Sequence, residues 1–88
     1  LEGYVTAAEW VGGGGPIVAL SIEGVLAALD PSSGAEVYRR AAHQTGGTTL
    51  AANPAADLVA TGGQDGVVRL WRGSDGTLLR ELDAGQVW

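Results

Sequence analysis

Cysteine is absent from the 88-residue sequence, which excludes disulfide bonds and thiolate metal sites. Lysine, phenylalanine and methionine are also absent, and the sequence contains a single histidine, His43. Basic residues are few, since five arginines stand against ten acidic residues and the net charge is −5. Only Arg39 and Arg40 are adjacent, so the chain has no basic stripe that could neutralise phosphates. We therefore expect no nucleic-acid partner.

Long apolar runs are missing too. Although 45% of the residues are apolar, no run approaches the roughly 18 to 20 residues that a membrane-spanning helix requires. No basic segment precedes an apolar one in the manner of a signal peptide. From these absences we expect a cytoplasmic protein without membrane contact. Because the sequence does not begin with Met, we also expect either a processed chain or a piece of a longer protein.

Helical patterns are scarce, because 15 glycines interrupt most windows before an apolar helical stripe can develop. Short apolar or alternating runs separated by turn residues are frequent instead, and they indicate β-strands. The connections EG and QDG are short enough for tight hairpins, which predicts antiparallel neighbours. We predict eight strands, at residues 4–10, 16–22, 25–30, 36–41, 48–53, 58–63, 67–71 and 77–82.

The predicted strands belong to a repeat. A shift of 42 residues places EGVLAAL (23–29) on DGVVRLW (65–71) and SSG (32–34) on SDG (74–76). Four short strands in a unit of about this length is the spacing of a β-propeller blade. The sequence thus predicts an all-β β-propeller fold, with two four-stranded antiparallel blades that are incomplete as a single chain. The predicted blades span residues 1–42 and 43–84, and a third repeat starts at 85–88.

The second unit, from His43 through NPAADLVATGGQDGVVRLW, resembles the WD-repeat family of β-propellers. The residues that carry the resemblance are His43 at the start of the unit, Asn53-Pro54 after the first strand, Gly62-Gly63, Asp65-Gly66 in the hairpin and Trp71 at the end of the third strand. Two positions depart from the family pattern. Ala42 replaces the usual glycine before the histidine, and Arg72 replaces the usual aspartate after the tryptophan.

The first unit departs further, because it carries Leu1, Glu23 and Leu29 at the positions of the histidine, the aspartate and the tryptophan. Its segment ALDPSSGAEVY (28–38) looks instead like the quinoprotein-type propeller repeat, in which alanine, aspartate, glycine and an aromatic residue recur at fixed offsets. The matching residues are Ala28, Asp30, Gly34 and Tyr38. Both repeat types share the blade architecture, so the mixture supports a propeller.

The WD-type resemblance implies a structural hydrogen-bond network of four side chains, namely His43, Thr61, Asp65 and Trp71. An aspartate can accept from the imidazole N–H and fix its tautomer, and a buried indole N–H needs an acceptor. We therefore expect the histidine to have a structural role and not to be a metal ligand or a catalytic base. The first unit lacks these side chains, and we expect it to depend on apolar packing through Val18, Leu20, Val25 and Leu29.

Other chemical motifs are weaker. Ser74, His43 and Asp75 have the residue types of a catalytic triad, but no nucleophile elbow or oxyanion hole accompanies them. Calcium would need the turn aspartates to converge, and each of them sits in a separate turn. Glycines 12–15 would cradle a phosphate only before a helix, and a strand-like segment follows them. We predict no enzymatic activity, no cofactor and no metal site.

A candidate partner-binding face consists of Tyr4, Gln64 and Trp88. In WD-type propellers, the resemblance implies that the loop before an innermost strand and the hairpin between the second and third strands open onto the face that meets partners. Tyrosine and tryptophan are frequent interface hot spots. Trp10 aligns with Ala52 on an innermost strand, and we expect it to pack between blades. Arg39 and Arg40 are expected on an outer strand, where charges protect an edge.

The leading functional hypothesis is a non-catalytic propeller scaffold or fragment that mediates protein–protein interaction or self-assembly. Its partners would be proteins or peptides, together with further copies of the chain or the remaining blades of a parent propeller. Two blades cannot close a ring, whereas three chains would give six blades and four would give eight. The alternative is a blade pair of a quinoprotein-like propeller, which binds a redox cofactor or serves in envelope assembly.

Overall fold

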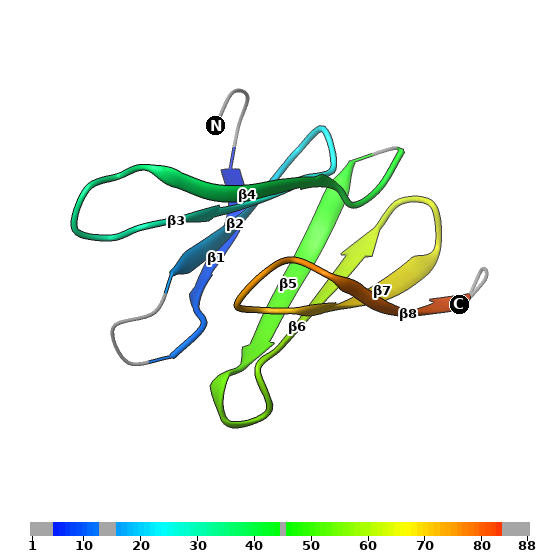
Figure 1. Cartoon of the computed structure of the whole chain (residues 1–88). Helices are drawn as coiled ribbons and strands as arrows, with labels where there is room; N and C mark the ends of the chain where they lie inside the picture. Colours follow the sequence, from blue (N-terminus) through cyan, green and yellow to red (C-terminus); the bar gives the residue numbers. More distant parts are fainter. Residues whose placement is uncertain (1–4, 13–15, 45, 84–88) are drawn as a thin grey trace.

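The computed structural model of the chain describes residues 5–12, 16–44 and 46–83. These residues form two four-stranded antiparallel sheets, each built from four strands in sequence order (Figure 1). The first sheet contains β1 (Val5–Trp10), β2 (Ile17–Ser21), β3 (Val25–Leu29) and β4 (Glu36–Ala41). The second sheet contains β5 (Gly47–Asn53), β6 (Leu58–Gly63), β7 (Val67–Arg72) and β8 (Leu78–Asp83). The predicted all-β fold class with two four-stranded antiparallel units is confirmed.

The segment between β5 and β6 forms a 3₁₀ turn, Pro54–Ala56. Proline suits the first position of this turn because its φ is fixed and its missing N–H is not needed there. Asp57 ends the turn in the left-handed region at φ 54°. Within the described ranges, no helix is long and apolar enough to cross a membrane.

The two sheets share their irregularities. In the first sheet, the β1–β2 register shifts between Val5 and Ala7, and in the second sheet the β5–β6 register shifts between Gly47 and Thr49. A second pair of shifts, in β3–β4 and in β7–β8, follows the same spacing. These positions are related by the 42-residue shift of the sequence repeat, so the repeat reproduces the backbone geometry as well as the order of strands.

Cross-strand partners in an antiparallel sheet lie on the same face, so the register defines the faces. The Tyr38 face of the first sheet carries the row Glu9, Val18, Ala28 and Tyr38. The Trp71 face of the second sheet carries the row Ala52, Val59 and Trp71. Side chains of these two faces form a single buried apolar cluster, so the core of the chain lies between the sheets.

The apolar packing of the first sheet differs in part from the prediction. Val18 and Leu20 of β2 are fully buried, as expected. In β3, however, the fully buried side chains of the cluster are Leu26 and Ala28, whereas Val25 and Leu29 are only partly buried. The prediction for Val25 and Leu29 was wrong because alternate residues of a strand point to opposite faces, and the even-numbered residues of β3 face the core.

The other two faces have no counterpart in the part of the chain that the structure describes. The Trp10 face of the first sheet carries Trp10, Ile17 and Leu29, and Trp10 is 56% exposed. The Arg80 face of the second sheet carries the row Ala51, Ala60, Leu70 and Arg80. The expectation that Trp10 packs between blades stays a prediction, because Trp10 lies on the face of the first sheet that is turned away from the second sheet.

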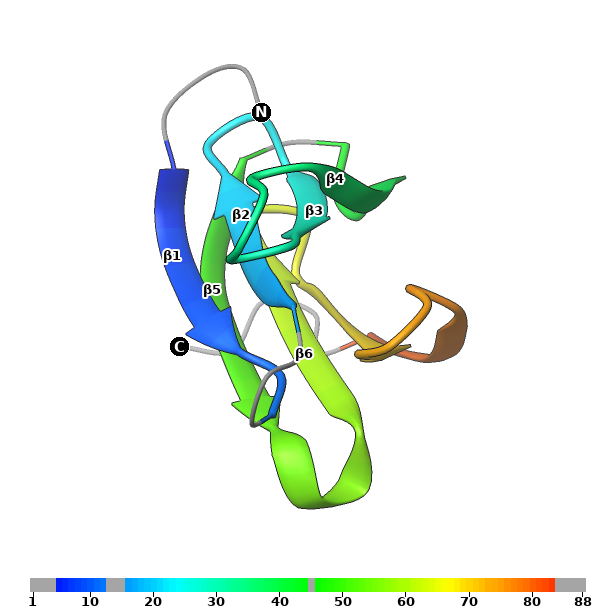
Figure 2. The same cartoon turned by 60° about the vertical axis from the view of Figure 1, so that its left-hand side comes forward.

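Strands β1 and β5 lie side by side at the inner edge of the two sheets (Figure 2). The Thr6 hydroxyl lies 3.0 Å from the carbonyl oxygen of Leu20 and 3.3 Å from that of Gly47, so it bridges the two sheets. The outer strands diverge from this edge (Figure 1). This arrangement leaves the outer strands to be joined by other contacts.

Candidate functional site

The connection between the sheets carries the only histidine of the chain, His43. Its backbone belongs to the first sheet, because the N–H groups of Ala42 and His43 both donate to the carbonyl oxygen of Gly24, at 2.9 and 3.0 Å. Gly24 has φ +91°, and a Cβ at this position would collide with the carbonyl oxygen of His43. Only glycine fits this turn without displacing the connection.

The imidazole of His43 belongs to the second sheet. Its Nδ1 lies 3.1 Å from both carboxylate oxygens of Asp65, and its Nε2 lies 2.9 Å from the Thr61 hydroxyl oxygen. The indole N–H of Trp71 donates to the same Thr61 oxygen at 3.0 Å. His43, Thr61 and Trp71 are all buried. The structure thus brings together the four side chains of the network suggested by the sequence.

One tautomer of His43 satisfies every donor of this network. If Nδ1 carries the proton, the imidazole donates to Asp65, the Thr61 hydroxyl donates to Nε2, and the Thr61 oxygen accepts from Trp71. In the other tautomer the Nδ1 lone pair could accept from Arg69 Nη1, 3.1 Å away, but it would also face the Asp65 carboxylate, and the Thr61 proton would lose its acceptor on the ring. The chain of hydrogen bonds therefore runs from Trp71 through Thr61 and His43 to Asp65.

Sequence reasoning missed a further member, Arg69 of β7. Its Nη1 donates to the Ala42 carbonyl oxygen at 2.7 Å and to Asp65 Oδ2 at 3.1 Å, and its Nη2 lies 3.2 Å from Glu81 Oε1. The signal that could have revealed Arg69 is the register of the β6–β7 hairpin, which places Arg69 directly opposite Thr61. This arginine joins the network to the connection between the sheets and to the outermost strand.

The electrostatics of the site keep Asp65 ionised. Desolvation acts to raise the pKa of Asp65, but hydrogen bonds from the Val67 N–H, His43 and Arg69 outweigh it and hold this pKa below its ordinary value of 3.8. Because the folded pKa is lowered, the ionised carboxylate stabilises the fold at and above the ordinary pKa. That stability is lost as the pH falls through the folded pKa.

We therefore expect a specific acid dependence for Asp65→Asn. The difference in unfolding free energy between the wild type and this variant should be largest near neutral pH and should shrink below about pH 4. Urea denaturation at a series of pH values measures it. The pKa values of Asp30, Glu36 and Asp75 are also lowered, but both proteins share them and they cancel in the difference. A difference that is constant from pH 7 to pH 3 would contradict the role of Asp65.

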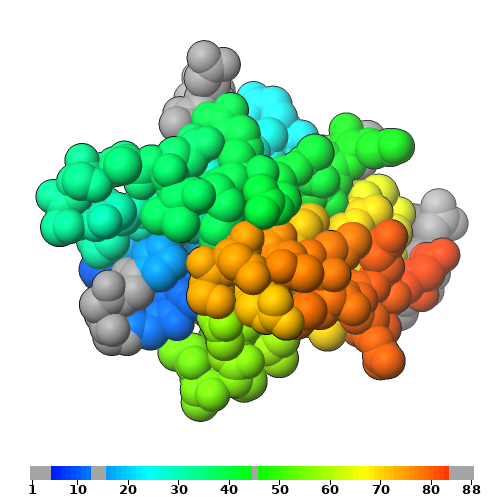
Figure 3. Space-filling model, in the orientation of Figure 1, coloured from blue at the N-terminus to red at the C-terminus, as the bar shows by residue number. Residues whose placement is uncertain are grey.

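A second set of contacts joins the outer strands. The Tyr38 hydroxyl donates to the carbonyl oxygen of Gly73 at 2.9 Å. Arg40 donates through Nε to the carbonyl oxygen of Gly76 at 2.9 Å and through Nη2 to that of Asp75 at 3.0 Å, and its Cζ lies 5.3 Å from the centre of the Tyr38 ring. Figure 3 shows β4, in green, against the orange turn between β7 and β8.

These contacts correct the expectation for the two adjacent arginines. Arg39 pairs with Glu36 on the same strand at 2.8 Å, which fits an exposed edge. Arg40 does more than protect an edge, because its guanidinium donates hydrogen bonds to the turn of the other sheet. That turn is itself fixed by Asp75, whose carboxylate accepts from the Thr77 N–H at 2.9 Å.

We expect Tyr38→Phe to reveal the strength of this contact. Burial raises the pKa of Tyr38 to about 12, although Arg40 acts to lower it. The neutral phenol therefore contributes stability that is fully present below the ordinary pKa of about 10 and is lost as the pH rises through the folded value. Losing the hydrogen bond to Gly73 should cost about 1 kcal/mol at neutral pH.

Absorbance titration of the phenolate measures the second part of this prediction. The wild type should show an ionisation near pH 12 that Tyr38→Phe lacks. Loss of an ionisation near pH 10, in place of one near pH 12, would show that Tyr38 is not the buried phenol. An unfolding free energy equal to that of the wild type at neutral pH would show that its hydrogen bond to Gly73 adds nothing.

The remaining residues named from the sequence lie apart from the network. The Ser74 hydroxyl donates to Asp57 Oδ2 at 2.7 Å, so Ser74 and His43 make separate contacts and do not form a triad. Asp30, of the quinoprotein-type pattern, accepts from the N–H and the hydroxyl of Ser32 and closes a turn. Across the described ranges, no group of three or more histidine, aspartate or glutamate side chains is placed to hold a metal ion.

The candidate partner-binding face is described only at Gln64. This residue is exposed in the β6–β7 turn, and its N–H donates to the Gly46 carbonyl oxygen at 3.0 Å. Tyr4 and Trp88 lie outside the described residues. The hydrogen-bond network also stabilises this turn, because Asp65 Oδ1 accepts from the Val67 N–H at 3.1 Å.

Many solved structures match the chain, and three of them serve as examples. The crystal structure of the computationally designed Ika8 protein is 28% identical, with a TM-score of 0.80, and the match covers 93% of this chain and 24% of that one. The computationally designed Ika4 protein is 23% identical, with a TM-score of 0.78, and the match covers 90% and 47%. A chain of the mitotic checkpoint complex is 24% identical, with a TM-score of 0.80, and the match covers 92% and 26%.

The match thus covers from about a quarter to about a half of the length of these three chains. No protein-family model and no curated protein matches the sequence. Identities at this level establish the fold. The two consecutive four-stranded antiparallel sheets, joined at their inner strands, are two blades of a β-propeller, a set too small to close a ring within one chain.

Proposed function

We propose that the chain is a non-catalytic β-propeller scaffold of the WD-repeat type that acts by binding protein or peptide. The observation that carries this proposal is the engagement of His43. Both ring nitrogens are held by side chains of the protein, Nε2 by Thr61 and Nδ1 by Asp65, and the ring is buried. A histidine used in this way stabilises the blade and has no ring nitrogen left for a substrate.

The same network supports a rigid binding edge. Asp65 is held by His43 and Arg69, and it accepts from the Val67 N–H within the turn that presents Gln64. A turn fixed on three sides loses little conformational freedom on binding, which favours affinity. We propose that a protein or peptide docks on the edge formed by Tyr4, Gln64 and Trp88. A match to a chain of the mitotic checkpoint complex, a multi-protein assembly, is consistent with this role.

The blade boundaries proposed from the repeat are 1–42 and 43–84, with a third repeat from residue 85. Completion of the ring then requires further copies of the chain or the remaining blades of a parent propeller, and we place this scaffold in the cytoplasm. No observation among the described residues favours the quinoprotein-like alternative. Ala28, Gly34 and Tyr38 of that pattern lie in a strand, in a turn and in the contact between the sheets.

A peptide display library tests the binding role. The immobilised chain should enrich a peptide consensus, and Gln64→Ala or Trp88→Ala should weaken binding of the enriched peptide by at least about tenfold. Leu79→Ala is the matched control, because Leu79 is exposed on the outermost strand β8 and should bind peptide like the wild type. The absence of enriched peptides, or peptides that bind all variants equally, would overturn the proposed function.

A further inference from the structure

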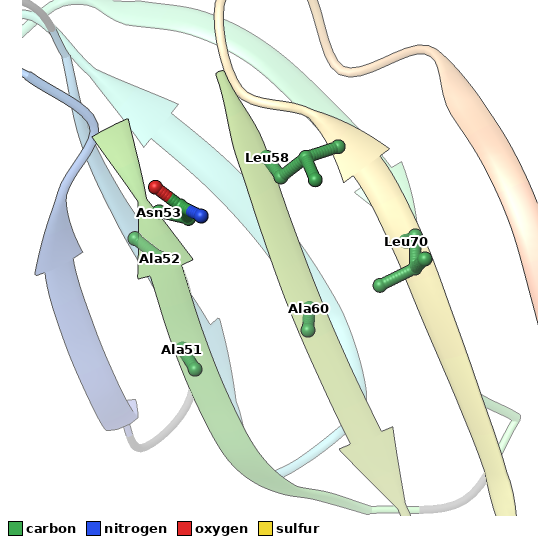
Figure 4. A pocket seen from close by; sticks show the side chains of 6 residues that line it. All are labelled: Ala51, Ala52, Asn53, Leu58, Ala60 and Leu70. Atoms are coloured by element: carbon green, nitrogen blue, oxygen red, sulfur yellow. The ribbon is translucent and has the colours of Figure 1, made fainter. Parts of the chain in front are cut away.

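The Arg80 face of the second sheet contains an apolar hollow of about 190 Å³ (Figure 4). Residues of three adjacent strands line it, namely Ala51, Ala52, Asn53, Leu58, Ala60 and Leu70. An apolar cavity of about 150 Å³ accepts benzene, so this hollow can receive a large part of an aromatic side chain.

The Trp10 face, on the opposite side of the molecule, carries an exposed aromatic side chain. Trp10 is the most exposed of the large apolar side chains in the described residues, at 56%. Partly buried Ile17 and Leu29 continue its row across the first sheet. An exposed apolar face of this kind marks an interaction surface.

The internal repeat relates these faces to the contact already present in the chain. Shifting the Tyr38 face by 42 residues gives the Arg80 face, and shifting the Trp10 face gives the Trp71 face. Within the chain, the Tyr38 face packs on the Trp71 face. The equivalent contact between chains would therefore place the Trp10 face of one copy on the Arg80 face of another.

We propose that the Arg80 face of the chain binds the Trp10 face of a second copy, head to tail, by repeating the contact between its own two sheets. Because each copy carries both faces, the contact is heterologous and generates a ring when the rotation closes. This inference names one partner of the proposed scaffold, but it rests on faces that the peptide-binding edge does not use.

The sizes of the side chains favour this pairing. Relative to the Tyr38 face, the Arg80 face replaces Glu9 and Val18 by Ala51 and Ala60 and replaces Ala28 by Leu70, and these three residues line the hollow. Relative to the Trp71 face, the Trp10 face has a tryptophan in place of Ala52. Small residues on one side thus face a large residue on the other, which is what close packing at a new contact requires.

Charged residues also favour the contact between the Arg80 face of one copy and the Trp10 face of another. Arg80 stands at the position of Tyr38, whose hydroxyl reaches the turn after Trp71. In the first sheet, the equivalent turn begins with Asp30, where the second sheet has Arg72. An arginine that replaces the tyrosine would therefore meet an aspartate, whereas within the chain the uncharged Tyr38 meets a turn that begins with an arginine.

The number of copies follows from the blade count of closed propellers. Rings of six or eight blades need three or four copies, and we expect four, because the chain spans 24% of the matched Ika8 chain, whose length four such units would fill. Size exclusion with light scattering on residues 1–88 should give a species of four times 8.9 kDa. A folded species of 8.9 kDa at every concentration would overturn the inference.

Charge reversal tests which faces meet. Arg80→Glu alone should place two carboxylates together, Asp30→Arg alone should place two guanidinium groups together, and each variant should lose the assembly. The two variants mixed in equal amounts should recover it, because alternating copies restore both pairings in a ring with an even number of chains. The double variant Arg80→Glu/Asp30→Arg should also assemble, whatever the number of copies.

Recovery of assembly in the mixture or in the double variant would show that each single variant fails because like charges meet, and not because the variant is misfolded. Asp30 also closes its own turn by accepting from Ser32, and Arg80→Glu cannot repair that turn. Glu23→Arg, in an exposed turn at the other end of β3, is the control for charge reversal and should assemble like the wild type. Trp10→Ala should raise the protein concentration needed for assembly by at least about 100-fold.

Assembly that is indifferent to Arg80→Glu, Asp30→Arg and Trp10→Ala would overturn the proposed contact. Failure here and failure of the scaffold proposal are distinguishable. A monomer that still binds enriched peptides through Gln64 would support the scaffold proposal and contradict the contact between copies. A ring that binds no peptide would support the contact between copies and contradict the scaffold proposal.

Discussion

Gly76→Ala should lower the free energy of unfolding by about 3 kcal/mol, whereas Gly34→Ala should lower it by only about 1 kcal/mol. The two glycines are equivalent in the repeat and have nearly the same backbone, with φ +74° at Gly76 and +76° at Gly34. An alanine at either position therefore has the same conformational free-energy cost of adopting the left-handed region.

Only the surroundings of the two glycines differ. A Cβ at Gly76 would lie 2.5 Å from Cδ1 of the Tyr38 ring, whereas a Cβ at Gly34 meets nothing within 4 Å. The Tyr38 ring cannot move away freely, because its hydroxyl is bound to Gly73 and Arg40 stacks on it. The additional loss at Gly76 therefore reports the packing between the two sheets.

Chemical denaturation of both variants, with far-ultraviolet circular dichroism as the probe, gives the two free energies. In the head-to-tail assembly, Gly34 would lie near Arg80 of another copy, whose flexible side chain can move aside. Equal losses for the two variants would show that Tyr38 does not pack against the turn. A loss confined to Gly34→Ala would contradict the arrangement of the sheets altogether.

The repeat made most of the fold predictable. Turn residues and short apolar runs mark each strand locally, and hairpin connections of two or three residues leave antiparallel pairing as the only choice. The 42-residue spacing then assigned four strands to each sheet. These features depend on neighbours in the sequence, which is why a single sequence reveals them.

Contacts between the sheets were not predictable in the same way. Arg40 reaches the carbonyl oxygen of Gly76, 36 residues away, and Arg69 reaches that of Ala42, 27 residues away. Backbone carbonyls carry no sequence signal, so neither partner could be read from the pattern. The exposure of Trp10 has a related cause, because an aromatic residue on an innermost strand is buried only if another sheet covers it.

The His43 network was predictable from the sequence only in part. Its four members were suggested by a family resemblance, and the structure brings them within hydrogen-bond distance. Their contribution to stability is still a prediction. Thr61 offers the sharpest test, because its hydroxyl is the only link between Trp71 and His43 in the described structure and its side chain is fully buried.

Thr61→Val should lower the free energy of unfolding by about 2–4 kcal/mol, because it keeps the shape of the side chain but leaves two buried polar groups, the Trp71 N–H and the His43 Nε2, without a partner. Thr49→Val, on the exposed part of strand β5 in the same sheet, is the matched control and should change stability by less than about 0.5 kcal/mol. Denaturation followed by tryptophan fluorescence measures both. If Thr61→Val unfolds at the same denaturant concentration as Thr49→Val, the hydrogen bonds of Thr61 add nothing to the stability of the blade, and the structural role proposed for His43 is wrong.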